Sequence, residues 1–224
     1  MKNIILIAPP AAGKGTQSQL ICDKYNIPHI STGDLLRKVS KEDSELGNLI
    51  REKMSSGSFV SDDIVIDMLI NRVKEPDCQN GYILDGFPRN VSQAEKYLEM
   101  LEANNLDVGD VIYLDLPKDI VRKRIVGRLS CSNCGSVYNN EFDESKPLNE
   151  GLCNKCNISL SKREDDTEEV FEKRYETYIK ETYPLVEFFG NKGLLFRIEN
   201  VLDKEETFKQ IEQIINRGDL WLRI

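Results

Sequence analysis

Residues 6–17, LIAPPAAGKGTQ, join an apolar run to a loop of small residues and then to a Gly-Lys-Gly-Thr stretch. A loop of this type can direct several backbone N–H groups at one anion, and the helix that follows adds the field of its N-terminus. Lys14 would supply a mobile positive charge, and Thr16 a hydroxyl near a phosphate oxygen or a magnesium ion. The stretch predicts a phosphate-binding loop; the alternative is an ordinary turn between a strand and a helix.

The loop departs from the usual G-x-x-x-x-G-K pattern at its first position, where Ala8 stands, and Ala11 and Ala12 fill its centre. Glycine adopts a positive φ freely, whereas alanine in that conformation costs roughly 1 kcal/mol. Alanine is still small enough to leave room for a phosphate. We therefore expect the substitutions to affect donor affinity or turnover and not the fold.

A second candidate site consists of two cysteine pairs, Cys131-x-x-Cys134 and Cys153-x-x-Cys156. Two matching pairs predict a closed tetrahedral site of four thiolates with a structural role, holding zinc or, alternatively, iron. A redox role is less favoured because two matching pairs are present. The surrounding residues 129–162 are too polar and too few to bury a core, so the metal would hold them folded.

Apolar runs alternate with helical patterns along the chain. The runs at 3–8, 82–87, 110–116 and 194–199 predict buried strands. The predicted helices cover 15–26, 61–74, 90–104, 118–129, 167–189 and 204–216. Such alternation predicts a parallel α/β sheet, whose ligands lie at the carboxyl ends of the strands. Lys14, Asp85 and the segment after Leu116 fall at that edge, while 31–60 and 129–162 interrupt the alternation as insertions.

The charge balance bears on the partners. The 224 residues carry a net charge of −8, and a nucleic-acid binder is normally basic, so we expect no nucleic-acid partner. The N-terminal apolar stretch of about five residues is far short of the roughly 20 that span a bilayer, and it lacks a cleavage pattern for export. We expect a cytoplasmic protein without a membrane partner.

Four further stretches appear in order along the chain: STGDLLR at 31–37, DGFPRNVSQAE at 85–95, RIVGRL at 124–129 and KREDDTEEVFEKRYETY at 162–178. Together with the phosphate loop, this combination resembles the adenylate kinase family, in the long form whose lid carries a metal-binding insert. The resemblance covers essentially the whole chain. It implies Mg²⁺-dependent, reversible phosphoryl transfer from ATP to AMP, giving two ADP.

The resemblance also implies an architecture. The core would be a P-loop NTPase-like parallel sheet flanked by helices, formed by residues 1–30, 61–128 and 163–224. A helical insert at 31–60 would bind AMP, and a small zinc-ribbon lid would occupy 129–162. Because all the required groups lie on one chain, a monomer suffices.

Site residues follow from the resemblance by position. The ATP-binding set is Ala12, Gly13, Lys14, Gly15, Thr16, Arg124, Arg128 and Tyr138. The AMP-binding set is Thr32, Gly33, Leu36, Arg37, Met54, Val60, Gly86, Arg89, Gln93, Arg163 and Arg174. The residues implied in catalysis are Lys14, Arg89, Arg128, Arg163 and Arg174. Gln93 would recognise the adenine edge, Asp85 would hold Mg²⁺ through water, and the four paired cysteines would hold Zn²⁺.

Elementary chemistry supports this set. Phosphoryl transfer requires in-line positioning and cations around the moving charge, and arginine grips phosphate oxygens with a planar fork. Any single arginine could equally be a solvated surface residue. Asp165 and Asp166 could cap the helix near Thr167 as well as orient arginines, and His29 is expected to pack and not to catalyse.

Three alternatives stay open. Glu199-Asn200 stands where the family tends to have Asp-Gly, near the donor base, so a relative that uses GTP is one of them. The altered phosphate loop allows a non-catalytic nucleotide-binding regulator. The cysteine pairs allow a zinc-ribbon nucleic-acid binder, which the acidic charge disfavours.

Overall fold

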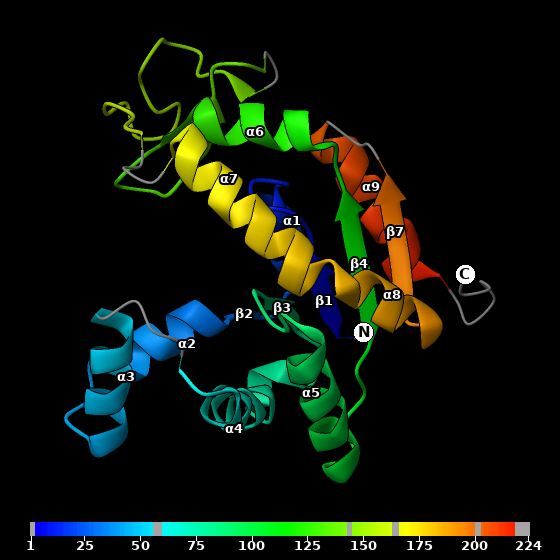
Figure 1. Cartoon of the computed structure of the whole chain (residues 1–224). Helices are drawn as coiled ribbons and strands as arrows, with labels where there is room; N and C mark the ends of the chain where they lie inside the picture. The colour runs from blue at the N-terminus through cyan, green and yellow to red at the C-terminus, as the bar shows by residue number, and fades with distance from the viewer. Residues whose placement is uncertain (1–2, 56–59, 143–144, 163–165, 200–202, 218–224) are drawn as a thin grey trace.

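A computed structural model describes residues 3–55, 60–142, 145–162, 166–199 and 203–217, with the backbone alone at 54 and 55. Within these ranges, a five-stranded parallel sheet has the order β2-β3-β1-β4-β7. Its strands are β1 (Ile4–Ile7), β2 (His29–Ser31), β3 (Ile83–Asp85), β4 (Asp110–Asp115) and β7 (Leu195–Glu199). The predicted parallel α/β fold is confirmed (Figure 1).

Helices cover both faces of this sheet. The described helices are α1 (Lys14–Tyr25), α2 (Thr32–Val39), α3 (Glu45–Ser55), α4 (Asp62–Val73), α5 (Val91–Ala103), α6 (Lys118–Val126), α7 (Glu168–Thr177), α8 (Pro184–Asn191) and α9 (Lys204–Asn216), of which α2 and α3 extend away from the sheet. A short 3₁₀ turn, Pro76–Cys78, and a π-helical turn, Tyr178–Thr182, complete the described helical segments. None of the helices in the described ranges is long and apolar enough to cross a membrane.

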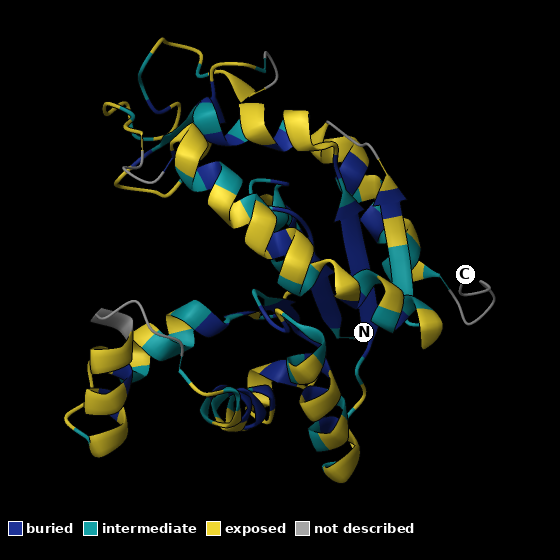
Figure 2. Cartoon of the chain, in the orientation of Figure 1, coloured by how far each residue is buried: buried dark blue, intermediate teal, exposed yellow. Residues whose placement is uncertain are grey.

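The side chains of β1 alternate between two buried clusters. Ile4 and Leu6 join α1, α6 and α9 on one face, whereas Ile5 and Ile7 join α4, α5 and α8 on the other. Successive residues of a strand point to opposite faces, so a run of apolar residues is what a strand covered on both sides requires. Figure 2 shows β1 and β4 buried along their length, beneath helices whose outer faces are exposed.

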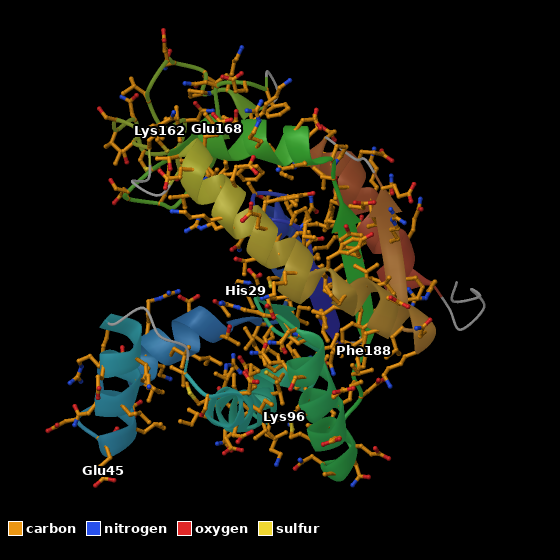
Figure 3. All side chains as sticks on the ribbon, in the orientation of Figure 1. His29, Glu45, Lys96, Lys162, Glu168 and Phe188 are labelled. Carbon is orange, nitrogen blue, oxygen red and sulfur yellow. The ribbon has the colours of Figure 1, made fainter. Side chains whose placement is uncertain are left out.

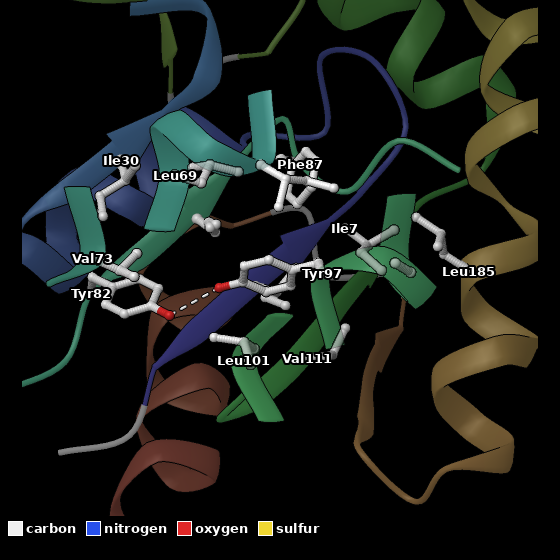
Figure 4. Close-up of a cluster of buried hydrophobic side chains, with 14 of the residues drawn as sticks. Ile7, Ile30, Leu69, Val73, Tyr82, Phe87, Tyr97, Leu101, Val111 and Leu185 are labelled. Carbon is white, nitrogen blue, oxygen red and sulfur yellow. Dashed lines mark hydrogen bonds between the residues drawn. The ribbon is translucent and has the colours of Figure 1, made fainter. Parts of the chain in front are cut away.

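The cluster against α4 and α5 contains two polar groups that are hydrogen-bonded to each other. The hydroxyls of Tyr82 and Tyr97 lie 2.9 Å apart in the interior, where an unpartnered hydroxyl would be costly (Figure 4). The ring of Phe87 meets that of Tyr97 edge-on, with 5.4 Å between ring centroids. This packing fixes the chain directly after β3, where Asp85 and Gly86 begin the loop that lines the site.

Residues 129–162, the cysteine segment, form a small unit apart from the main sheet. Strand β5 (Arg128–Ser130) pairs antiparallel with β6 (Val137–Asn139), and Ser130 forms a further bridge with Ser161. In Figure 1 this segment lies above the sheet at the upper left, and α2 and α3 lie at the lower left. Both predicted insertions thus extend from the same side of the molecule in this view.

Three elements differ from the sequence prediction. The single helix expected over 167–189 is divided, because the π-helical turn and Pro184 separate α7 from α8. The helix expected over 118–129 ends at Val126, since Arg128 already pairs with Asn139 in the cysteine segment. Strand β2 was not among the predicted strands, because three residues are too few to show a period.

Candidate active site and cysteine cluster

The backbone of the loop between β1 and α1 shows which of its alanines is strained. Ala11 and Gly13 both have positive φ, 60° and 95°, so Ala11 occupies a conformation that glycine would adopt more cheaply. Ala8 is buried, and its φ is not positive. The strain predicted for an alanine in this loop therefore falls on Ala11 and not on Ala8.

Lys14 is the first residue of α1, and its side chain turns back across the loop. Its Nζ donates to the carbonyl of Ala8 at 3.3 Å. Removal from water lowers the pKa of the ammonium group, an effect that the Asp85 carboxylate opposes and the Arg89 charge reinforces. A dehydrated cation beside a helix N-terminus is well suited to holding a polyphosphate.

A cleft of about 450 Å³ opens between this loop and helix α7. Among the predicted site residues, its lining includes Lys14, Asp85, Gly86, Arg89 and Arg174. Helix α7 and the π-helical turn also contribute Lys173, Thr177, Tyr178 and Thr182, which the sequence did not single out. Groups from the ends of β1 and β3 and from α7 thus converge on one space.

Asp85, at the end of β3, is ionised on the cleft wall. Burial acts to raise the pKa of its carboxyl, but the hydrogen bond with His29 and the charges of Lys14 and Arg89 outweigh it, so the pKa is lowered. Nε2 of His29 lies 3.2 Å from Oδ2 of Asp85. An ionised, partly exposed carboxylate next to a phosphate loop is the oxygen ligand that Mg²⁺ prefers, so the residues present fit that ion.

His29 does more than pack, which corrects the sequence expectation. It lies in β2, two residues before Ser31, the position in register with Asp85, and therefore on the same face of the sheet. Figure 3 labels His29 where the sheet meets the segment that leads to α2. The contact was missed because recognising it requires the pairing of β2 with β3.

The acceptor side is built around Gly86. Its φ is +75°, and an added Cβ would lie 3.6 Å from Nη2 of Arg89 and 3.7 Å from Oγ1 of Thr32. The carbonyl of Gly86 accepts from Nε of Arg89 at 2.8 Å and from Thr32 Oγ1 at 3.4 Å. Leu36 and Val65 meet Thr32 around a small hollow nearby. The structure thus brings the predicted residues Thr32, Leu36, Gly86 and Arg89 together.

Other predicted acceptor residues lie elsewhere. Arg37 is exposed on α2, where it pairs with Asp34 at 2.5 Å beside Gly33. It is not among the residues that line the cleft. Val60 packs against the core cluster. Arg163 and the side chain of Met54 lie outside the described residues, as does Asp165.

The donor side adjoins the start of α1, where Gly15 and Thr16 are exposed. Nη1 of Arg124 donates to the carbonyl of Ala12 at 3.3 Å, and its guanidinium lies 5.7 Å from the centroid of the Phe142 ring. Helix α6 therefore places Arg124 against the phosphate loop, and the ring of Phe142 brings the cysteine segment alongside.

Arg128 points away from solvent toward Asp166, its Nε donating to Oδ2 at 2.7 Å. The sequence suggests Asp166 as a helix cap, but Thr167 caps α7, its hydroxyl accepting from the N–H of Val170 at 3.3 Å. Asp166 instead binds Arg128, which agrees with the expectation that it orients an arginine.

The four paired cysteines gather at one point. The sulfurs of Cys131, Cys134, Cys153 and Cys156 all lie within 4.8 Å of one another. Zinc–sulfur bonds of about 2.3 Å in a tetrahedron separate the sulfurs by about 3.8 Å, so the four groups fit the ion. Nδ2 of Asn133 contacts the sulfur of Cys156 at 3.3 Å, which would orient that ligand.

Tyr138 belongs to this cluster. Its side chain is buried, and its hydroxyl accepts from the N–H of Asn154 at 2.9 Å and lies 3.5 Å from the sulfur of Cys153. The resemblance implies that this residue also contacts ATP, and that assignment stays a prediction. Its aromatic ring supplies much of the apolar packing around the cysteines.

Comparisons with known proteins cover nearly the whole chain. A family model described as adenylate kinase matches residues 6–194. An adenylate kinase of Archaeoglobus fulgidus is 41% identical over 215 residues, which are 96% of this chain and 98% of that protein. Those of Clostridium tetani and a Geobacillus species are 41% and 42% identical over 213 residues each, covering 95% of this chain and 98% of each relative.

Proposed function

The chain belongs to the adenylate kinase family and transfers a phosphoryl group between ATP and AMP, and we propose that it does so in the cleft between the phosphate loop and α7. The observation that carries the proposal is the convergence of Lys14, Asp85, Arg89 and Arg174 on that cleft. Three cations and one carboxylate from distant parts of the chain form an arrangement suited to two facing polyphosphates.

ATP would bind along the loop of Ala12, Gly13, Gly15 and Thr16, with its terminal phosphates over the N-terminus of α1. Lys14 would contact these phosphates, because its ammonium group is already held over the loop. Arg124 lies against the same loop and would bind the donor from the side of α6. Tyr138 would contact the donor as well, and its hydroxyl would hold the cysteine segment in shape.

Adenylate kinases use Mg²⁺ with ATP, and the bound ion would neutralise charge on the phosphate oxygens. Asp85 would hold the ion through water. His29 supports this role, because its hydrogen bond fixes the carboxylate that faces the cleft.

AMP would bind on the opposite side, over Gly86. Arg89 would grip its phosphate, since the bond from Nε to Gly86 leaves the two terminal nitrogens of the guanidinium to contact oxygens. Thr32, Leu36 and Val65 would border the nucleoside, and Gln93 would recognise the adenine edge. Arg37, Gly33, Val60 and Met54 would contribute only after α2 and α3 approach the cleft.

Arg174 on α7 would contact the phosphoryl group in transit, together with Arg128 and Arg163. A cleft that closes over both nucleotides excludes water, which strengthens each contact and prevents hydrolysis. We propose residues 31–60 and 129–162 as the closing AMP-binding insert and lid, and 1–30, 61–128 and 163–224 as the core. The four cysteines would hold a structural zinc ion in the lid.

All of the proposed groups lie on one chain, which supports a monomer, and we propose the cytoplasm as its location. The test is to measure the rate of ADP formation from ATP and AMP in a coupled assay, with and without Mg²⁺. We expect rapid, Mg²⁺-dependent production of two ADP for each AMP consumed. Absence of ADP from a folded, nucleotide-binding protein would make it a regulator and not a kinase.

A further inference from the structure

The side-chain amide of Gln93 is held at both ends. Its Oε1 accepts the backbone N–H of Arg89 at 2.8 Å, and its Nε2 donates to Oδ1 of Asp62 at 2.7 Å. A backbone N–H can only donate, and an ionised carboxylate can only accept. The two partners together therefore fix which end of the amide is oxygen and which is nitrogen.

The surrounding elements hold this arrangement in place. Gln93 is the third residue of α5, and its own N–H is capped by Oδ1 of Asn90 at 2.9 Å. Asp62 is the first residue of α4, which packs against α5. Both side chains are half-buried. The amide thus lies directly after the loop that carries Arg89, and α4 also carries Val65 of the hollow described above.

We propose that Asp62 determines the acceptor base, by fixing the orientation of the Gln93 amide. The proposal rests on the assigned function, in which Gln93 recognises the base of the monophosphate. Each amide oxygen has a second lone pair, and each amide nitrogen a second hydrogen. With both partners engaged, Gln93 still offers one acceptor and one donor to a base.

That remaining pair discriminates between purines. Adenine presents an amino donor beside a ring-nitrogen acceptor, whereas guanine presents a carbonyl acceptor at the corresponding place and a ring N–H donor beside it. Guanine can therefore replace adenine in the same orientation only if the amide of Gln93 turns over. Turning would face Oε1 toward the carboxylate of Asp62 and Nε2 toward the N–H of Arg89, which creates two repulsive contacts.

Asp63, the next residue, provides a matched control. It is exposed, and its Oδ1 pairs with Nζ of Lys96, labelled in Figure 3, at 2.7 Å. Adjacent carboxylates in the first turn of one helix thus face different partners. Replacing either one by asparagine removes the same charge from the same helix terminus, but only the change at Asp62 touches Gln93.

The experiment compares kcat/KM for AMP and for GMP, with ATP as donor, in the full-length protein. Asparagine can accept or donate, so Asp62→Asn removes one of the two repulsive contacts that oppose the turned amide, and only the N–H of Arg89 still opposes it. We expect the AMP-to-GMP ratio to fall by roughly tenfold in Asp62→Asn and to stay within about twofold of wild type in Asp63→Asn. Asp62→Glu, which can still only accept, should retain most of the discrimination.

A double-mutant cycle tests whether Asp62 acts through Gln93. Gln93→Ala should lower the ratio, and Asp62→Asn added to it should change the ratio no further. A merely structural role would lower both kcat/KM values together and leave the ratio unchanged, which would overturn the inference. Should Asp62→Asn unfold in a thermal melt, Asp62→Ser is measured in its place with the same expectation.

The activity of the wild-type protein separates the proposed function from the role of Asp62. If wild type makes no ADP from AMP, the assigned function is wrong. If wild type is active and Asp62→Asn retains the full AMP-to-GMP ratio, the function stands and the specificity role of Asp62 is contradicted.

Discussion

Arg128 and Asp166, which flank the cysteine segment on its two sides, form an ion pair with two contacts. Nε of Arg128 donates to one carboxylate oxygen at 2.7 Å, and Nη2 contacts the other. The carboxylate is fully buried, and the guanidinium is 17% exposed. Because Arg128 opens the segment and Asp166 follows it, the pair ties together the two ends at which the segment joins the core.

Removing the charge of Asp166 should therefore lower the free energy of unfolding. A buried guanidinium that loses its partner typically costs 3–5 kcal/mol, and the partial exposure of Arg128 reduces that to about 2 kcal/mol for Asp166→Asn. Urea unfolding measures the change. Glu169→Gln is the control, because it removes an exposed partner of Lys173 and should leave the free energy of unfolding unchanged. Equal effects of both substitutions would show that the pair has no special structural role.

Metal removal should act on the cysteine segment. Elemental analysis of the native protein is expected to give about one zinc ion per chain, and Cys153→Ala should lower both the zinc content and the Tm. Cys22→Ala, outside the cluster, should retain the metal. The phosphoryl transfer itself should persist at low temperature in Cys153→Ala, since the core carries the phosphate loop. A native protein purified without zinc, and stable without it, would contradict the assignment.

Substitution by glycine should change the stability little at Ala11 and lower it at Ala8. Ala11 has a positive φ, so Ala11→Gly relieves roughly 1 kcal/mol of strain and offsets most of the entropy that glycine adds to the unfolded chain. Ala8→Gly brings no such relief and removes a buried methyl group, so it should destabilise by about 1 kcal/mol. Thermal melts of the two variants compare them directly, and a larger loss at Ala11 would contradict the backbone geometry.

Thr182 should position the acceptor loop. Its hydroxyl donates to the carbonyl of Arg89 at 2.8 Å and so links the turn after α7 to the residue proposed to grip AMP. Thr182→Val should lower kcat/KM for AMP about fivefold, the equivalent of roughly 1 kcal/mol, with little change in KM for ATP. Thr207→Val is the control, because that hydroxyl bonds to the carbonyl of Asp203 at the start of α9 and does not line the cleft. A proportional loss for both substrates would indicate a general structural effect.

The periodicity of the sequence predicted the sheet well because β1 and β4 are buried on both faces and consist almost wholly of apolar residues. It could not predict β2, which has three residues, or the break at Tyr178–Thr182, where the helical pattern continues through the π-helical turn. Such local departures depend on tertiary packing.

In the candidate site, too, some contacts could be predicted from the sequence and others could not. Lys14, Gly86 and Arg89 lie in or just after the loops that follow β1 and β3, so the edge of the sheet brings them together, as the sequence predicted. The pairs His29–Asp85 and Asp62–Gln93 join residues 56 and 31 positions apart, and neither spacing carries a local signal. The assignment of Tyr138 to ATP stays a prediction, and its packing among the cysteines could not be predicted from its position in the sequence.

The central claim is that Lys14, held over the phosphate loop, contacts the phosphates in transfer. Lys14→Met retains the apolar part of the side chain and removes the ammonium group, so a thermal melt should show a folded protein. The decisive measurement is the turnover of ATP and AMP by this variant with saturating Mg²⁺. We predict a loss on the order of a thousandfold; a folded Lys14→Met variant that turns over within about threefold of wild type would contradict the account.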